Sequence, residues 1–113
     1  MKIKSAIAAL AALAQESRLA VFRALVRAGP AGLSAGTLAK GASISPSALS
    51  FHIKELVHAD MVSARPDGRF IIYVANFMAM NGLVAFLTAN CCGGNPCTPV
   101  RVPVCSTRKK ETT

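Results

Sequence analysis

Three cysteines lie within seven residues near the end of the chain. Cys91 and Cys92 are adjacent, and Cys97 follows after the segment Gly-Gly-Asn-Pro. These residue types favour a turn, which can bring the third thiol back towards the first two. Thiolate sulfur is a soft ligand that selects soft or thiophilic ions and discriminates against magnesium, calcium and manganese. The spacing therefore predicts a metal or metalloid site formed by Cys91, Cys92 and Cys97.

Other chemistry is open to the same thiols. A structural zinc site usually contains a Cys-x2-Cys pair, which this cluster lacks. Its fourth ligand would have to be Cys105, across a proline-rich span, and we expect Cys105 to be a bystander. Neighbouring thiols also oxidise readily, so a redox switch is a second alternative. The third alternative is that the cysteines belong to an inert tail without a ligand.

The rest of the chain has the charge of a protein that binds a polyanion. Its 113 residues are enough for one domain with a modest core. The net charge is +8, and residues 1–90 keep +5, from nine lysines and arginines against four acidic residues. Nucleic acid is therefore the expected partner, in preference to a membrane surface.

The residues that would indicate catalysis are missing from the sequence. It has only two histidines, His52 and His58, and it lacks a carboxylate pair and a phosphate-binding glycine-rich loop. A thiol-dependent reductase would require Cys-x-x-Cys beside a βαβ unit, which is also lacking. We expect a protein that is not an enzyme and holds no permanently bound cofactor.

The amino terminus resembles a secretory signal. The apolar run Ala6–Leu13 follows two lysines and ends near a small-x-small pattern, Ala12-Leu13-Ala14. The run is mainly alanine, however, and its helical pattern continues without a break into Glu16–Val26. We therefore predict a structural helix that is retained in the mature protein. No apolar stretch reaches the ~20 uncharged residues of a transmembrane helix, so we expect a soluble, cytoplasmic protein without a membrane partner.

A helix-turn-helix pattern follows. An amphipathic helix around Leu19–Val26 is stopped by Gly29-Pro30. Ser34 can cap a brief helix that reaches Lys40 and is ended by Gly41. Ser45 and Pro46 then provide a cap and a preorganised first residue for a helix over 47–59. Two helices joined by a short turn form this motif.

The second helix has the register of a DNA-reading helix. Its buried stripe is predicted at Leu49, Ile53, Leu56 and Val57. The opposite face carries mostly polar side chains, namely Ser47, Ser50, Phe51, Lys54 and His58. Short hydroxyl side chains near the start of a helix can approach base edges, whereas Lys54 favours phosphates. A merely solvated face is the alternative interpretation.

A β-hairpin is predicted directly after that helix. The runs Met61–Arg65 and Arg69–Val74 flank Pro66-Asp67-Gly68, and Asp-Gly between two such runs is a strong hairpin signal. Arginines stand on both sides of the tip, where they can meet the DNA backbone or minor groove. A hairpin that only closes the core would not require them. Together with the charge, this arrangement favours a winged DNA-binding domain.

Three stretches of the chain resemble the ArsR/SmtB family of winged-helix repressors: ALAQESRLAVF (12–22), SFHIKEL (50–56) and GRFIIY (68–73). The resemblance spans residues 8–90. It implies a homodimer built on the N-terminal and C-terminal helices, bound to an inverted repeat in double-stranded operator DNA and released by a toxic metal or metalloid. Ser50 and His52 match the Ser-x-His pattern of the family's reading helix. Helical geometry places His52 near the buried edge, so a phosphate contact and a packing role both remain open.

The ligands known in the family must be sought in this chain one by one. The arsenic sensors' Cys-x-Cys before the reading helix is replaced here by Ser34 and Gly36. The zinc sensors' C-terminal ligands are also lacking, since residues 77–90 contain no Asp, Glu or His. The thiols that remain, Cys91, Cys92 and Cys97, resemble those of an arsenic-responsive subgroup whose cysteines lie at the end of the last helix. Trivalent arsenic prefers three sulfurs in a pyramid, which the cluster can supply.

We therefore expect a mainly α protein with one β-hairpin, folded as a homodimeric winged helix-turn-helix. Residues 1–90 would form the DNA-binding and dimerisation domain, and residues 91–113 the ligand segment with a partly disordered tail. The function predicted is an operator-bound repressor that As(III) or Sb(III) releases, with redox or other soft-metal sensing as the alternative. The residues expected to contact DNA are Ser47, Ser50, His52, Lys54, Arg65 and Arg69, and the ligands are Cys91, Cys92 and Cys97.

Overall fold

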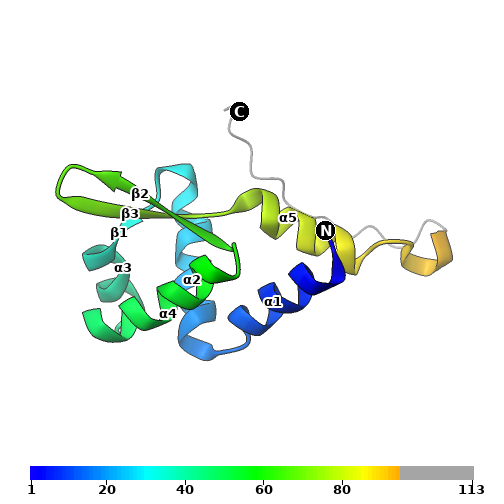
Figure 1. Ribbon diagram of the computed structural model, residues 1–113, viewed down its shortest axis with the longest axis horizontal. Helices are drawn as coiled ribbons and strands as arrows, with labels where there is room; N and C mark the ends of the chain where they lie inside the picture. The colour runs from blue at the N-terminus through cyan, green and yellow to red at the C-terminus, as the bar shows by residue number, and fades with distance from the viewer. Residues whose placement is uncertain (95–113) are drawn as a thin grey trace.

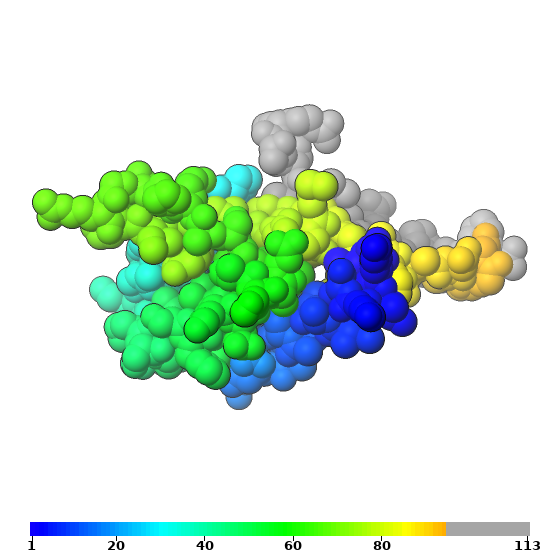
Figure 2. Space-filling model, in the orientation of Figure 1, coloured from blue at the N-terminus to red at the C-terminus, as the bar shows by residue number. Residues whose placement is uncertain are grey.

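A computed structural model describes residues 1–94 of the chain. A β-hairpin projects at one end of the molecule, the helix-turn-helix lies beneath it, and the first and last long helices lie together at the other end (Figures 1 and 2). Cys97, Cys105 and the tail lie outside the described residues. The elements are α1 (Ile3–Leu13), α2 (Glu16–Ala28), η1 (Gly29–Ala31), β1 (Leu33–Ser34), α3 (Ala35–Ala42), α4 (Pro46–His58), β2 (Val62–Asp67), β3 (Phe70–Ala75), α5 (Phe77–Leu87) and η2 (Cys91–Gly94).

The amino-terminal helix is broken, contrary to the continuous helix predicted from the sequence. α1 ends at Leu13, and Gln15 starts α2 by accepting a hydrogen bond from the Arg18 backbone N–H at 2.9 Å. Nε of Arg18 also donates to the Ala12 carbonyl at 2.6 Å, which holds the corner. Among the described residues, no single helix is long and apolar enough to cross a membrane. Two consecutive helical segments, Ile3–Leu13 and Glu16–Ala31, would together be long and apolar enough for a span by length and composition alone. They are bent by 104° relative to each other.

The helix-turn-helix is capped as the sequence predicts. Ser34 Oγ accepts a hydrogen bond from the Thr37 N–H at 3.3 Å, and Ser45 Oγ accepts one from the Ala48 N–H at 3.1 Å. These bonds satisfy helix-start N–H groups that would otherwise have no partner. The predicted end of the first helix at Gly41 is wrong. α3 continues to Ala42 and ends at Ser43, whose left-handed conformation (φ +57°) stops it.

The core is apolar and lies between α2, α3, α4 and the start of the hairpin. Leu25, Leu38, Leu49, Leu56 and Met61 are fully or almost fully buried. Of the stripe predicted on α4, Leu49, Ile53 and Leu56 are buried. The prediction that Val57 is buried is wrong, because its side chain is 40% exposed. It lies at the margin of the stripe, where α4 faces the hairpin across an open groove.

The hairpin forms as predicted, but its turn is shifted by one residue. Asp67 pairs with Phe70, so Gly68 and Arg69 form a two-residue turn in which Gly68 has φ +63°. A glycine at the first turn position is what a type II′ hairpin turn favours.

A short third strand, which the sequence did not reveal, completes the sheet in the order β1-β3-β2. Its residue Leu33 pairs with Tyr73 of β3. Gly32, just before β1, has φ +72°, and a Cβ there would collide with the Tyr73 carbonyl. Glycine is therefore required where the chain crosses β3.

Candidate nucleic-acid interface and thiol cluster

The polar face predicted on α4 is open to solvent. At 100° per residue, Ser47 and Lys54 lie opposite the buried stripe, and Ser50 lies on the side of the hairpin. All three side chains are exposed. Ser47 Oγ lies 3.3 Å from Ser45 Oγ, so the start of the helix presents a pair of hydroxyl groups beside its unpaired N–H groups. This end of α4 can approach the edges of bases or a phosphate.

His52 lies at the edge of the buried face, where helical geometry predicts it. The side chain is half-buried, and its Nδ1 atom is buried without a hydrogen-bond partner among the described residues. Its ring meets that of Phe51 edge-on, with centroids 5.5 Å apart and planes at 69°. The choice between a phosphate contact and packing stays a prediction.

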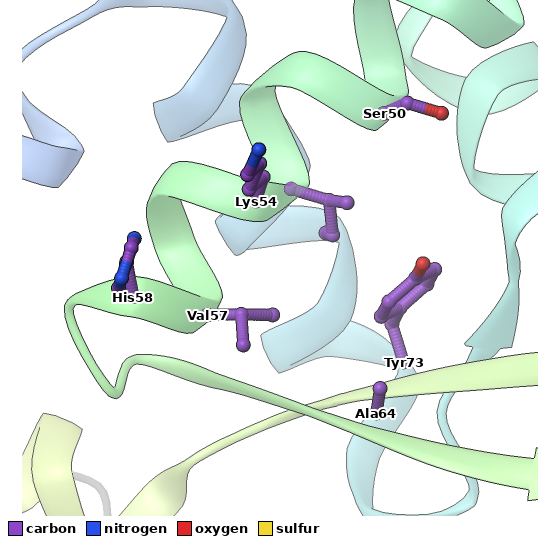
Figure 3. A pocket seen from close by; sticks show the side chains of 7 residues that line it. Ser50, Lys54, Val57, His58, Ala64 and Tyr73 are labelled. Carbon is purple, nitrogen blue, oxygen red and sulfur yellow. The ribbon is translucent and has the colours of Figure 1, made fainter.

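An open groove separates α4 from the hairpin. Its volume is about 500 Å³, and both the helix and the two strands line it. Figure 3 shows the Tyr73 ring standing in the gap between β3 and α4, with Ala64 beside it on β2. Lys54 and His58 point away from the strands in the same view. Lys54, the cation expected to bind phosphate, is exposed and borders the groove from the helix side. No pattern in the sequence pointed to the groove, because its two walls are joined only by the fold.

The two hairpin arginines are placed differently, although the sequence put both at the tip. Arg69 is in the turn itself. Arg65 pairs with Ile72, further back along the strands, and one of its guanidinium N–H groups donates to the Ala31 carbonyl at 3.3 Å. Both side chains are exposed. Arg69 is therefore free to meet a ligand at the tip, whereas Arg65 also ties the hairpin to η1.

Cys91 and Cys92 follow the last helix in a tight turn. α5 ends at Leu87, and Thr88 Oγ1 closes it by donating to the Val84 carbonyl at 2.8 Å. Both cysteines are exposed, and their sulfur atoms lie 3.7 Å apart. Cys92 has a left-handed backbone (φ +57°), and glycines follow it. Within residues 1–94 no three His, Cys, Asp or Glu side chains come close enough to hold a metal, and the third predicted ligand, Cys97, lies beyond them.

The comparisons with known proteins agree with this architecture. A family model described as a helix-turn-helix domain matches residues 13–63. An ArsR-like transcriptional regulator from Rhodococcus sp. RHA1 is 28% identical, over 74% of this chain and 76% of that one, with a TM-score of 0.66. HlyU from Vibrio cholerae is 26% identical over 81% of this chain and 99% of its own, with a TM-score of 0.63.

The chain has the winged helix-turn-helix fold of the ArsR-like regulators. The homodimeric winged helix-turn-helix DNA-binding domain Mb0332 from Mycobacterium bovis shares this fold. It is 18% identical over 86% of this chain and 90% of that one, with a TM-score of 0.62. Among curated proteins, no sequence match was found. The predicted mainly α winged helix-turn-helix fold is confirmed, with β1 as an addition to the hairpin, and the homodimer stays a prediction.

Within the described residues, α1 and α5 carry apolar side chains that are exposed to solvent. On α1 the alanines Ala6, Ala9 and Ala12 face the core, while a second stripe at i, i+4 and i+7 is exposed. It consists of Ile3, Ile7 and Leu10. On α5, which contacts α1, the large exposed apolar side chains are Met78, Phe86 and Leu87. Both helices lie at the end of the molecule opposite the hairpin in Figure 2. We call these six side chains the α1/α5 surface.

Proposed function

We propose that this protein is a homodimeric transcriptional repressor whose hold on operator DNA is released when As(III) or Sb(III) binds thiolates beyond α5. The observation that carries the DNA-binding part is the exposed face of α4 beside a projecting hairpin, on an ArsR-like fold in a chain of net charge +8. Such a repressor acts in the cytoplasm, where thiols stay reduced.

The DNA-binding step follows from the placement of α4. Its first turns enter the major groove, with Ser47 and Ser50 at base edges and Lys54 at a phosphate. The turn residue Arg69 reaches the backbone or the minor groove beside it, as a wing does. Because most of this energy is electrostatic, binding weakens steeply with salt.

The homodimer is supported by the α1/α5 surface. Large apolar side chains are exposed on both helices, and pairing of two copies through α1 and α5 would remove such side chains from water in a two-fold interface. The fold is shared with the homodimeric Mb0332 domain. Pairing through α1 and α5 leaves both α4 helices free, and two reading helices one DNA turn apart match an inverted repeat.

The ligand part rests on the geometry of two sulfurs. For a bond of about 2.3 Å from ion to thiolate, as with zinc, a sulfur separation of 3.7 Å corresponds to an angle of roughly 107° at the ion. That angle suits a pyramidal or tetrahedral ion. Cys91 and Cys92 can thus act as a pair without rearrangement. Cys97 would be the third ligand, and thiolates favour a soft or thiophilic ion.

The thiols can affect DNA binding because they follow α5 closely. Only Thr88, Ala89 and Asn90 separate Cys91 from the last residue of that helix. A ligand that reshapes this turn would shift the end of α5, and with it the α1/α5 surface that sets the distance between the two α4 helices. A coupling of about 1–3 kcal/mol is enough for a severalfold to hundredfold change in affinity.

The test is a titration of the reduced protein with arsenite. Operator duplexes are first selected from a random pool, and binding is followed by fluorescence anisotropy while thiol reagent counts the free cysteines. We expect release with the loss of three titratable thiols per protomer. Release by peroxide but not by arsenite would instead favour the redox alternative. No binding to any duplex would refute the repressor.

A further inference from the structure

Phe51 occupies the centre of the exposed face of α4. At 100° per residue it lies within about 40° of Ser47 and about 60° of Lys54, and roughly opposite the buried stripe. Its side chain is 61% exposed. Within residues 1–94 its one aromatic contact is the edge-on contact with the neighbouring His52. The middle of the proposed DNA-reading face is therefore apolar and aromatic.

A lone apolar side chain on a surface is common and needs no special cause. Phe51 differs because of its neighbours. One turn before it and one turn after it stand Ser47 and Lys54, which are polar and exposed. On a face that enters the major groove, the central side chain comes closest to the bases. Phenylalanine offers neither a hydrogen-bond donor nor an acceptor there.

The chemistry of base edges narrows what such a side chain can contact. In the major groove, guanine, cytosine and adenine present donors and acceptors, and thymine alone adds a methyl group. Apolar side chains recognise thymine through that methyl group, whereas a phenyl ring over a polar edge would leave the base unsatisfied. Phe51 is the sixth residue of α4, within the first two turns, from which a recognition helix reads bases.

We infer that Phe51 reads the C5-methyl group of a thymine and so specifies an A·T pair in each half of the operator. The inference rests on the proposed function and deepens it. The competing explanation is a second copy of the chain that covers the ring. The exposed stripe suited to such a copy, however, lies on α1 and α5, at the other end of the molecule from the start of α4.

The experiment removes the methyl group without changing any hydrogen bond. Operators selected by the parent protein are synthesised with deoxyuridine in place of each thymine in turn, and the affinity of both forms is measured. Burying one methyl group changes affinity by about fourfold, so replacement in both half-sites should cost about fifteenfold. In Phe51→Ala the ratio between thymine and uracil duplexes should fall to about one, and Phe51→Leu should keep part of it.

Phe70→Ala is the matched control, since Phe70 is 67% exposed but lies on β3. We expect it to keep the ratio of the parent. Three results would overturn this inference but leave the proposed function standing. They are equal affinities of the parent for thymine and uracil duplexes, an unchanged thymine-to-uracil affinity ratio in Phe51→Ala, and loss of that ratio in Phe70→Ala. Conversion of Phe51→Ala to a monomer in sedimentation would overturn it in favour of a protein contact. Failure of the parent to bind any duplex would overturn the proposed function as well.

Discussion

The Sγ atoms of Cys91 and Cys92 lie 3.7 Å apart on adjacent residues, one of which has a left-handed backbone. Adjacent side chains on an extended strand point in opposite directions. Here the turn after α5 brings the two thiols to the same side. The two sulfurs are therefore already adjacent within the described residues, and under the proposed function Cys97 would supply the third.

Loss of one thiol should separate DNA binding from release. Cys91→Ser or Cys92→Ser should bind operator as the parent does but stay bound at arsenite concentrations that release the parent, because two sulfurs hold a pyramidal ion poorly. Cys97→Ser should behave in the same way. Anisotropy with increasing arsenite measures this. Cys105→Ser is the control and should respond normally, and its failure to respond would point to a four-thiol metal site.

Loss of an outward-facing cation should weaken binding to every sequence. Lys54→Ala or Arg69→Ala removes one phosphate contact per protomer, so the slope of log K against log salt should become shallower by about two units per dimer. Arg65→Ala should lower affinity too, through a phosphate contact and through the lost bond to Ala31. Arg23→Ala, an exposed cation on α2, is the control. An equal effect there would mean that only net charge matters.

Loss of a hydroxyl group at the start of α4 should affect discrimination instead. Ser47→Ala or Ser50→Ala should reduce the ratio of operator to random-duplex affinity by about fivefold or more, as expected when a base contact is lost. Competition with random duplex measures this ratio. Ser63→Ala, an exposed serine on β2, should leave it unchanged. If affinity for both duplexes falls equally, the serines on α4 do not read bases.

A charge placed in the α1/α5 surface should separate the protomers. Ile7 is 59% exposed on α1, and Ile7→Lys would place a cation opposite its own copy in a two-fold interface. We expect a monomer in sedimentation and a large loss of operator affinity. Leu19→Lys changes an exposed leucine on α2 and should remain dimeric. A dimeric Ile7→Lys would show that the chain pairs through another surface.

Two glycines should respond oppositely to the same substitution. Gly32→Ala adds a Cβ at φ +72° against the Tyr73 carbonyl, and we expect it to destabilise the fold by about 1–3 kcal/mol. Gly41→Ala adds a Cβ within α3 that meets nothing within 4 Å, and it should stabilise by up to about 1 kcal/mol. Urea unfolding measures both. A neutral Gly32→Ala would contradict the close approach of the chain to β3.

The sequence predicted α4 well because several independent signals agree there. Ser45 caps it, Pro46 begins it, and Leu49, Ile53 and Leu56 repeat at helical spacing. Val57 was mispredicted because periodicity alone does not reveal that the adjoining groove is unfilled. The break between α1 and α2 was missed because its cap is Gln15, a residue type without a strong capping preference, in the middle of a helix-forming run.

Features that depend on contacts between distant parts of the chain could not be predicted from the sequence. β1 consists of two residues and exists because Leu33 and Tyr73 meet in the fold, so no local pattern marks it. The role of Arg65 in holding η1 is of the same kind, since 34 positions separate it from Ala31. The predicted roles of Cys91, Cys92 and the DNA-contacting residues remain predictions, and the third expected ligand, Cys97, lies outside the described residues.

The outer position of β2 has a consequence for the protein at high concentration. β2 is an edge strand of the sheet, and edge strands invite strands from other molecules to pair with them. Here the exposed part of the edge carries Arg65, Pro66 and Asp67 in succession. Proline cannot donate a hydrogen bond to an incoming strand, and the flanking charges oppose its close approach. This edge of the hairpin is therefore protected against pairing with a strand of another molecule.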